Sequence, residues 1–266
     1  MEGRCNAAAR QQHVYDLTES ETNELTQEFL KTKSIAARDR FVCFEVEGTD
    51  PFANIARQVE REVFEDSWGN DSATLQKEYG PYDGSSLFFL AVDMHKTVPA
   101  GVVRVIRNSP AGLKTLVDLQ DRFKSPRAPI AIPVDHSMGY HGIDDLDRCW
   151  DGATAAVRRR YRGKLAAIYL QIGRVLGGAM IRENIQHLVA VLDAPIFKAA
   201  REVLGLPIVP LADTVPFTYM GAPNNQAVYA RVSMLVTAAT RNRKVRHHIR
   251  SCLADRALPV PGALPS

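Results

Sequence analysis

Apolar residues in the first half of the chain fall into runs typical of strands and spacings typical of helices. The segment TESETNELTQEFLKTK predicts a helix from Thr18, because Thr18 and Glu21 have the spacing of a capping box. Runs rich in aromatic and β-branched residues predict strands, two of which join in a hairpin. The expected elements are helices at 18–33, 51–64 and 111–123 and strands at 40–48, 86–93 and 101–107.

Two polar segments, 65–85 and 125–148, contain Gly and Pro and interrupt these elements. We expect both to be loops that wrap a substrate site. The second half predicts helices at 164–183 and 194–204, a basic C-terminal helix, and strands at 150–157, 185–192, 208–220 and 227–232. This order of elements indicates an α/β fold with a mixed sheet covered by helices on both faces.

Neither internal repeats nor a clear linker divides the chain, so we expect one domain. Residues 1–17 indicate a flexible leader, 18–258 the domain with its basic C-terminal helix, and 259–266 a tail. The composition, 45% hydrophobic and 24% charged, is that of an ordinary globular protein. A formal net charge of +3 is too small to indicate a dedicated nucleic-acid-binding protein.

The cysteines at positions 5, 43, 149 and 252 are widely separated and form no C-x-x-C pair. This spacing argues against a zinc site or a disulfide framework and fits a reducing compartment. The first residues lack the apolar core of a signal peptide, and no run approaches the roughly 20 apolar residues that span a bilayer. We therefore expect a soluble cytoplasmic protein with no transmembrane segment and no bound metal.

A basic turn between a predicted strand and a long predicted helix carries the clearest chemistry. It reads Val157-Arg-Arg-Arg-Tyr-Arg-Gly-Lys164 and leads into an apolar helix start. The first backbone N–H groups of a helix have no internal partner, and the helix dipole places partial positive charge there. With four arginines and a lysine beside it, this helix end would hold a pyrophosphate or a phosphopantetheine phosphate. A solvated basic loop is the alternative.

At this turn the chain resembles the GNAT superfamily of N-acetyltransferases. The family pattern is a strand ending in Val, three residues, Tyr-Arg-Gly-Lys and a glycine-containing loop that opens a helix, where this chain has Leu165 in place of a glycine. The resemblance implies a GNAT-like, largely antiparallel twisted sheet and a donor that is acyl-CoA or the phosphopantetheine of an acyl-carrier protein. It assigns donor binding to Val157, Arg158, Arg159, Arg160, Tyr161, Arg162, Gly163, Lys164 and Ala167.

A second, partial resemblance is to acyl-homoserine-lactone synthases, which share the GNAT fold and take acyl chains from acyl-carrier protein. Their pattern is Val-Phe, then Trp, an E-x-D-x-[FY]-D motif and an Arg on the following hairpin. The matching residues here are Val63-Phe64, Trp68, Glu78 to Asp83 with Gly80 for the central aspartate, and Arg104. Asp151 stands where a later E-[IV]-[ST]-R motif of that family has its glutamate.

These matches imply roles for individual residues. Asp151 is the expected general base, because the acceptor amine must lose a proton to attack a thioester. Glu78 and Asp83 follow as catalytic candidates that would bind a cationic acceptor; for each carboxylate the alternative is an ordinary surface position. Substrate contacts are expected from Trp68, Arg104 and Trp150, although tryptophans more often pack in a core than line an acyl pocket.

The sequence thus predicts an enzyme that moves an acyl group from acyl-CoA or acyl-carrier protein to the amine of a small molecule. Leu165 and the acidic motif favour a longer acyl thioester. A non-catalytic GNAT-like sensor that binds a carrier or CoA is the alternative. Nucleic-acid binding by the basic stretch 241–250 is a weaker reading, because no aromatic residues are interleaved there. That stretch would equally dock an acidic carrier protein, and a homodimer is left open.

Overall fold

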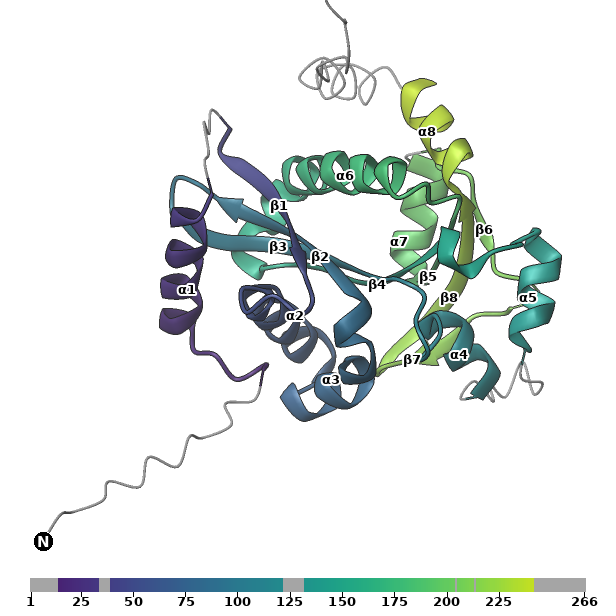
Figure 1. Cartoon of the computed structure of the whole chain (residues 1–266), viewed down its shortest axis with the longest axis horizontal. Coiled ribbons are helices and arrows are strands. Elements are labelled where there is room, and N and C mark those ends of the chain that lie inside the picture. The colour runs from purple at the N-terminus through teal and green to yellow at the C-terminus, as the bar shows by residue number, and fades with distance from the viewer. Residues whose placement is uncertain (1–13, 34–38, 122–131, 204, 213, 242–266) are drawn as a thin grey trace, which may run out of the picture.

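The computed structural model describes residues 14–33, 39–121, 132–203, 205–212 and 214–241. Within them the chain forms one sheet of eight strands with helices on both faces (Figure 1). The strands lie in the order β1-β2-β3-β4-β5-β8-β6, and β7 pairs with β8 beside that path. Their bounds are β1 Phe41–Glu47, β2 Ser86–Asp93, β3 Val98–Ile106, β4 Cys149–Val157, β5 His187–Asp193, β6 Ile208–Pro210, β7 Phe217–Tyr219 and β8 Ala222–Arg231.

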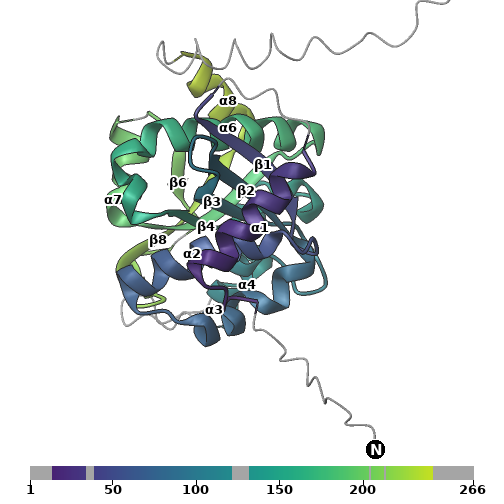
Figure 2. The same ribbon diagram turned by 90° about the vertical axis from the view of Figure 1, so that its left-hand side faces the viewer.

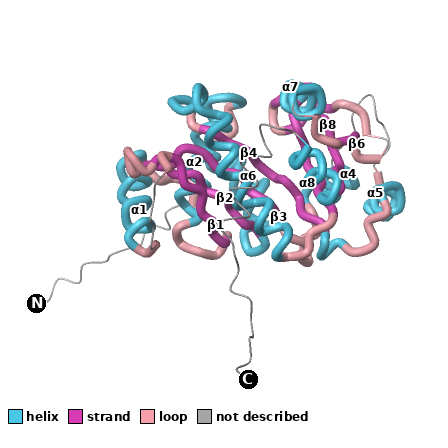
Figure 3. The backbone as a smooth tube through the Cα atoms, turned by 90° about the horizontal axis from the view of Figure 1, so that it is seen from above, coloured by secondary structure: helices cyan, strands magenta, loops and turns pink. Residues whose placement is uncertain are grey.

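Helices cover the sheet from two sides. Figure 2 shows α6 on one side of the sheet and α2 and α3 on the other. Seen from above, α1 and α5 lie at opposite ends of the molecule (Figure 3). The bounds are α1 Glu19–Lys31, α2 Ala53–Trp68, α3 Ser72–Tyr79, α4 Lys114–Asp121, α5 Val134–His141, α6 Leu165–Arg182, α7 Ala194–Lys198 and α8 Val232–Arg241.

The core lies on both faces of β2, which explains the continuous apolar run of that strand. Phe88 and Leu90 belong to the apolar cluster under α2, whereas Leu87 and Phe89 belong to the cluster under α6. All four side chains are fully buried. A strand covered on both faces has no need for alternating polar residues, so β2 is apolar from Leu87 to Val92.

One pair of neighbouring strands in the sheet is parallel. β4 and β5 run in the same direction and are connected by α6, while the other described pairs are antiparallel. The two parallel strands pair only from Cys149 with His187 to Gly152 with Ala190. Beyond this point β4 continues along β3 and β5 continues along β8. The sheet is therefore mixed and largely antiparallel, and the predicted fold class is confirmed.

Elements with strong local signals agree closely with the prediction. Thr18 caps α1, and the reciprocal capping box with Glu21 is present. The strand predicted at 86–93 has the bounds of β2, and the helix predicted at 164–183 is α6 with one residue fewer at each end. The local signal is the cap in α1, and in β2 and α6 it is an apolar pattern of the length typical of the element.

The described parts of the two predicted loops are largely helical. Segment 65–85 holds the end of α2, all of α3 and a 3-10 helix at Gly80–Ser85. Asp71 starts α3 by accepting a hydrogen bond from the Thr74 N–H. Within 125–148, α5 and a 3-10 helix at Leu146–Arg148 form, while residues 122–131 lie outside the described residues.

Tyr15 belongs to the segment 1–17 that the sequence indicates as a leader. Tyr15 is fully buried, and its hydroxyl accepts a hydrogen bond from Arg104 Nη2 at 2.7 Å. Packing of the domain therefore begins before Thr18. Residues 1–13, the part of the basic C-terminal segment beyond Arg241 and the tail lie outside the described residues.

One described helix is long and apolar enough to cross a membrane by length and composition alone, and the expectation of no transmembrane segment stays a prediction. The helix comprises Arg159–Arg182, counting the 3-10 turn before α6, and its most apolar stretch of 18 residues has a mean hydropathy of 1.2. Ile168, Ile172 and Ala179 of this helix pack in the cluster beneath it. Core helices of soluble proteins meet the same length and composition criteria, so the helix is weak evidence for a membrane span.

Candidate active site

The divergence of β4 and β5 opens the middle of the sheet. A β-bulge lies on β4 at the same place, since Arg104 of β3 pairs with Thr154 and Val105 pairs with Gly152, skipping Ala153. Such a bulge leaves the extra residue outside the ladder and bends the strand. A side chain at Gly152 would press on the Ala190 side chain at 3.3 Å, so glycine lets the two strands pair closely until they part.

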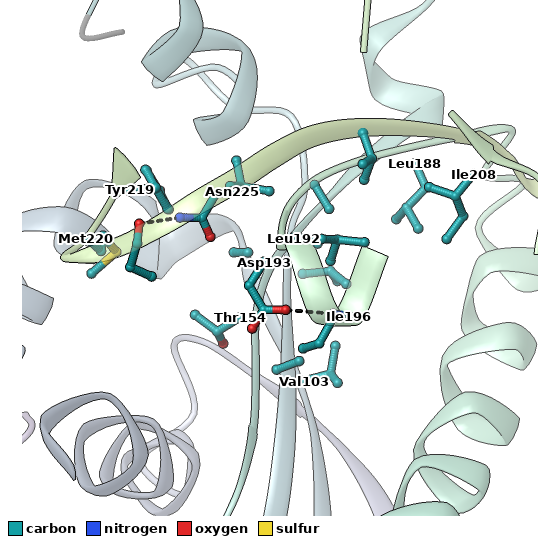
Figure 4. A pocket seen from close by; sticks show the side chains of 18 of the residues that line it. Val103, Thr154, Leu188, Leu192, Asp193, Ile196, Ile208, Tyr219, Met220 and Asn225 are labelled. Carbon is teal, nitrogen blue, oxygen red and sulfur yellow. Dashed lines mark hydrogen bonds between the residues drawn. The ribbon is translucent and has the colours of Figure 1, made fainter. Parts of the chain in front are cut away.

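A cavity of about 250 Å³ lies at this divergence (Figure 4). Its wall includes residues of the cluster under α6, such as Leu176 and Leu188, and residues of the opposite side, such as Phe64 and Tyr79. The cavity therefore reaches both faces of the sheet. Its lining consists of Phe64, Trp68, Tyr79, Val103, Val105, Gly152, Ala153, Thr154, Ala155, Leu176, Leu188, Ala190, Val191, Leu192, Asp193, Ile196, Ile208, Tyr219, Met220, Ala222, Asn225, Val228 and Ala230.

A buried ion pair stands behind the cavity wall on the α2 side. Arg104 Nη2 contacts Glu60 Oε2 at 2.6 Å, and both side chains are fully buried. The Thr154 hydroxyl, on the cavity wall, donates a hydrogen bond to the same carboxylate. Asp83 adds a longer contact to Arg104 at 3.6 Å and pairs with Arg57 at 3.0 Å. Buried ion pairs therefore stabilise this side of the cavity wall through the hydrogen bond of Thr154.

A second polar cluster joins α3, α4 and β7. Lys114 Nζ contacts Glu78 Oε2 at 2.9 Å and Asp118 Oδ2 at 2.6 Å. The Tyr219 hydroxyl donates to the same Asp118 oxygen at 3.0 Å. Burial raises the pKa of Tyr219 well above its ordinary value, so the hydroxyl keeps its proton. The Tyr79 ring, which also lines the cavity, lies 5.4 Å from Lys114 Nζ.

The basic turn lies directly after β4 and forms a 3-10 helix at Arg159–Lys164 before α6 begins. Arg158 is buried and pairs with Glu62, so it holds the turn to α2. Arg160 pairs with Glu19 at 2.6 Å, and Arg162 lies 3.5 Å from Asp66. Arg160, Arg162 and Lys164 are exposed. Surface pairs of this kind are weak, so these cations remain available to an anionic ligand.

Asp151, the predicted base, is fully buried and does not line the cavity. Its Oδ2 accepts a hydrogen bond from the Thr115 N–H at 2.5 Å, and its Oδ1 accepts one from the Thr115 hydroxyl at 2.9 Å. Burial raises the pKa of Asp151 to about 6, although the Thr115 hydrogen bonds oppose the rise. A proton acceptor near neutral pH has such a pKa. The assignment as base stays a prediction.

The other predicted residues divide between cavity and core. Trp68 lines the cavity at the end of α2 and is 37% exposed. Trp150 is buried under α6 beside Phe89, and Arg104 is enclosed in its ion pair, so neither lines the cavity. Glu78 and Asp83 belong to the two polar clusters behind the wall. Their substrate roles stay predictions.

Asp193 is the charged residue of the cavity lining that sequence patterns did not single out. It ends β5 and caps α7, where its Oδ1 accepts a hydrogen bond from the Ile196 N–H at 2.7 Å. In the sequence it precedes Ala-Pro, which indicates only a helix start. Thr154, Tyr79 and Tyr219 also line the cavity. Among the described residues, no group of three or more acids, histidines or cysteines is arranged for a metal.

No protein-family model and no curated protein sequence matches the chain. Among solved structures, FeeM, an N-acyl amino acid synthase from uncultured soil microbes, matches over 78% of this chain and 98% of its own, with 13% identity and a TM-score of 0.51. The chain has a GNAT-type fold. The acyl-homoserine lactone synthase LasI also matches, with 15% identity over 74% of this chain and 92% of its own and a TM-score of 0.47. BjaI, a CoA-dependent acyl-homoserine lactone synthase, matches with 13% identity over 76% of this chain and 89% of its own and a TM-score of 0.46.

At 13% identity the likeness to FeeM is one of fold and leaves the reaction open. The GNAT-type fold nonetheless accounts for the order in which the site is built along the chain. β4 first lines the cavity with Gly152 to Ala155, then reaches the basic turn, and α6 returns across the sheet to β5. A single residue, Ala156, thus separates the cavity lining from the turn that begins at Val157.

Proposed function

We propose that this protein transfers an acyl group from an acyl thioester to the amine of a small molecule. The observation that carries the proposal is the apolar cavity between the diverging strands β4 and β5, a few residues before the basic turn. An acyl thioester of CoA or of a carrier protein has an apolar chain at one end and phosphate at the other. The cavity and the turn supply matching surfaces in that order.

The donor's acyl chain is assigned to the α6 side of the cavity. Val103, Val105, Leu176, Leu188 and Ile208 form the wall there, and none has a polar side-chain atom. Its phosphate is assigned to the exposed cations of the turn and the first N–H groups of α6. An apolar chamber of this size suits a chain longer than acetyl. Both acyl-CoA and acyl-carrier protein fit this arrangement, in a soluble cytoplasmic enzyme.

The reaction forms a bond between the acceptor nitrogen and the thioester carbonyl carbon and breaks the carbon–sulfur bond. The nitrogen gives up a proton, and the departing thiolate gains one. Negative charge develops on the carbonyl oxygen, and backbone N–H groups stabilise it best. We assign this role to the bulge at Ala153, which the β3 register skips and which lies beyond the last β4–β5 pair. Asp151 is retained as the candidate base.

Thiol release from a series of acyl-CoAs, from acetyl to palmitoyl, and from acyl-carrier protein tests the proposal. We expect release with a longer acyl group, accelerated by a suitable amine. Donor binding measured by calorimetry separates two failures. Binding without turnover on any donor would leave a non-catalytic sensor, and the absence of both would overturn the proposed function.

A cavity-blocking variant sharpens the test. Ala155→Trp places a large ring at an exposed position of the lining, so it should abolish turnover while the protein stays folded. Ile181→Trp is the matched control, since Ile181 is 63% exposed on α6 and does not line the cavity. Thermal melting of both variants establishes that they fold. Full activity in Ala155→Trp would contradict the assignment of the cavity.

A further inference from the structure

The charges around the cavity restrict the acceptor, given the proposed acyl transfer. We propose that the acceptor is a cationic amine without a carboxylate of its own, and that Asp193 binds its ammonium group. This inference rests on the proposed function and names the class of its second substrate. The evidence is the placement of Asp193, the pairing of the nearby cations and the surplus of carboxylates behind the wall.

Among the described residues that line the cavity, Asp193 is the one with a charged side chain. Figure 4 shows its side chain between Thr154 and Ile196, with the dashed hydrogen bond to the Ile196 N–H. That bond orients the carboxylate but brings no positive charge. Leu192 and Ile196 beside it are apolar, and the polar neighbour Thr154 carries no charge. A carboxylate at an apolar wall is stabilised strongly by a cation, and an ammonium group supplies one.

A carboxylate on the acceptor would find no comparable partner. None of the lining residues in the described part of the chain is a cation. Arg104 and Lys114, which both contact the Tyr79 ring, are buried and already paired, Arg104 with Glu60 and Lys114 with two acids. Burying a carboxylate without a partner is costly. The described part of the site therefore disfavours amino acids in comparison with their decarboxylated amines.

The charges behind the wall strengthen this preference. Lys114 faces the two carboxylates of Glu78 and Asp118, whereas Arg104 and Glu60 balance each other. Buried Asp151 adds a further carboxylate near the same helix, since it binds Thr115. Carboxylates thus exceed cations around this side of the cavity. Such a field attracts a positive group and repels a negative one.

Pairs of acceptors that differ only in the carboxylate test the inference. Phenethylamine with phenylalanine, and agmatine with arginine, are suitable pairs, each assayed with the best acyl donor. We expect kcat/KM at least about tenfold higher for the amine, which corresponds to one charge-assisted contact. Equal or better use of the amino acids overturns the inference while leaving acyl transfer intact. Absence of donor binding and turnover would instead overturn the proposed function.

Asp193→Asn isolates the charge from the cap, because asparagine caps a helix about as well as aspartate. We expect KM for the amine to rise about tenfold or more, with donor binding and melting temperature close to wild type. Glu202→Gln removes an exposed carboxylate outside the lining and should change nothing. An unchanged KM in Asp193→Asn, with the fold intact, refutes the role of Asp193.

Discussion

Thr154 on β4 donates a hydrogen bond to Glu60 on α2, and Glu60 also holds Arg104 on β3. Three elements therefore meet at one fully buried carboxylate. Thr154 is the first residue after the skipped Ala153, so this contact fixes β4 where it leaves β5. The shape of the cavity depends on a buried charge network as well as on apolar packing.

Breaking the Arg104–Glu60 pair should destabilise the protein strongly. Arg104→Met leaves a buried carboxylate without its cation, and we expect a loss of about 3–5 kcal/mol in the free energy of unfolding. The double variant Arg104→Met, Glu60→Met should recover much of that loss, because it leaves no uncompensated charge. Urea unfolding measures both. If the free energy of unfolding of Arg104→Met lies within about 1 kcal/mol of wild type, as expected for a solvent-exposed ion pair, the pair is not buried.

The buried Asp151 carboxyl should make stability depend on pH. Burial raises its pKa from 3.8 to about 6 in the folded protein. Because the folded state binds the proton more tightly, this contribution to stability is complete below about pH 4 and is lost as pH rises through 6. The free energy of unfolding of the wild type, relative to that of Asp151→Asn, which cannot titrate at this position, should fall across that window by up to about 3 kcal/mol. Urea unfolding between pH 4 and 8 measures it, and a pH-independent difference would contradict the shift.

The pH dependence of the rate distinguishes a catalytic role of Asp151 from a structural one. As general base it would set the acidic limb of the kcat profile near pH 6, and Asp151→Asn would remove that limb. As an anchor for α4 through Thr115, it would change stability and leave the profile in place. Rates of acyl transfer between pH 5 and 8 distinguish the two roles.

Local signals in the sequence were sufficient for the framework. Thr18 and Glu21 indicate the start of α1, and the run at 86–93 is a strand because it is apolar and bounded by polar turns. α3 was missed because only Leu75 and Tyr79 are buried in it, which is too weak a pattern to stand out from a polar loop. Tyr15 was missed because its burial depends on Arg104, far away in the chain.

The candidate site was harder to predict for the same reason. The basic turn is local and could be read directly, including its place before α6. The cavity arises where β4 and β5 separate, and this depends on pairing between distant segments. Asp193 carries the pattern of a helix cap, which hides its second position on the cavity wall. Trp150 is of a residue type that often lines acyl pockets, but its side chain packs in the core under α6.

Charge reversal in the basic turn should weaken donor binding. Arg160→Glu and Arg162→Glu replace exposed cations beside the start of α6, and we expect about a tenfold loss of affinity for acyl-CoA in each. Arg182→Glu is the control, because Arg182 is equally exposed but lies at the other end of α6. Calorimetry at two salt concentrations should show a weaker salt dependence in the turn variants. Unchanged affinity for acyl-CoA in both variants would show that the donor phosphate does not bind at this turn.

The α6 wall of the cavity should set the preferred acyl length. Leu176 projects from α6 into the lining and is only partly buried, so both enlargement and truncation are compatible with folding. Leu176→Ala should favour longer acyl-CoAs and Leu176→Trp shorter ones, by about fourfold in kcat/KM per methylene gained or lost, since one buried methylene contributes about 0.8 kcal/mol. Ile181→Ala on the outer surface of α6 should leave the preference unchanged. If both Leu176 variants change kcat/KM by the same factor for all acyl-CoAs, the acyl chain of the donor does not occupy this side of the cavity.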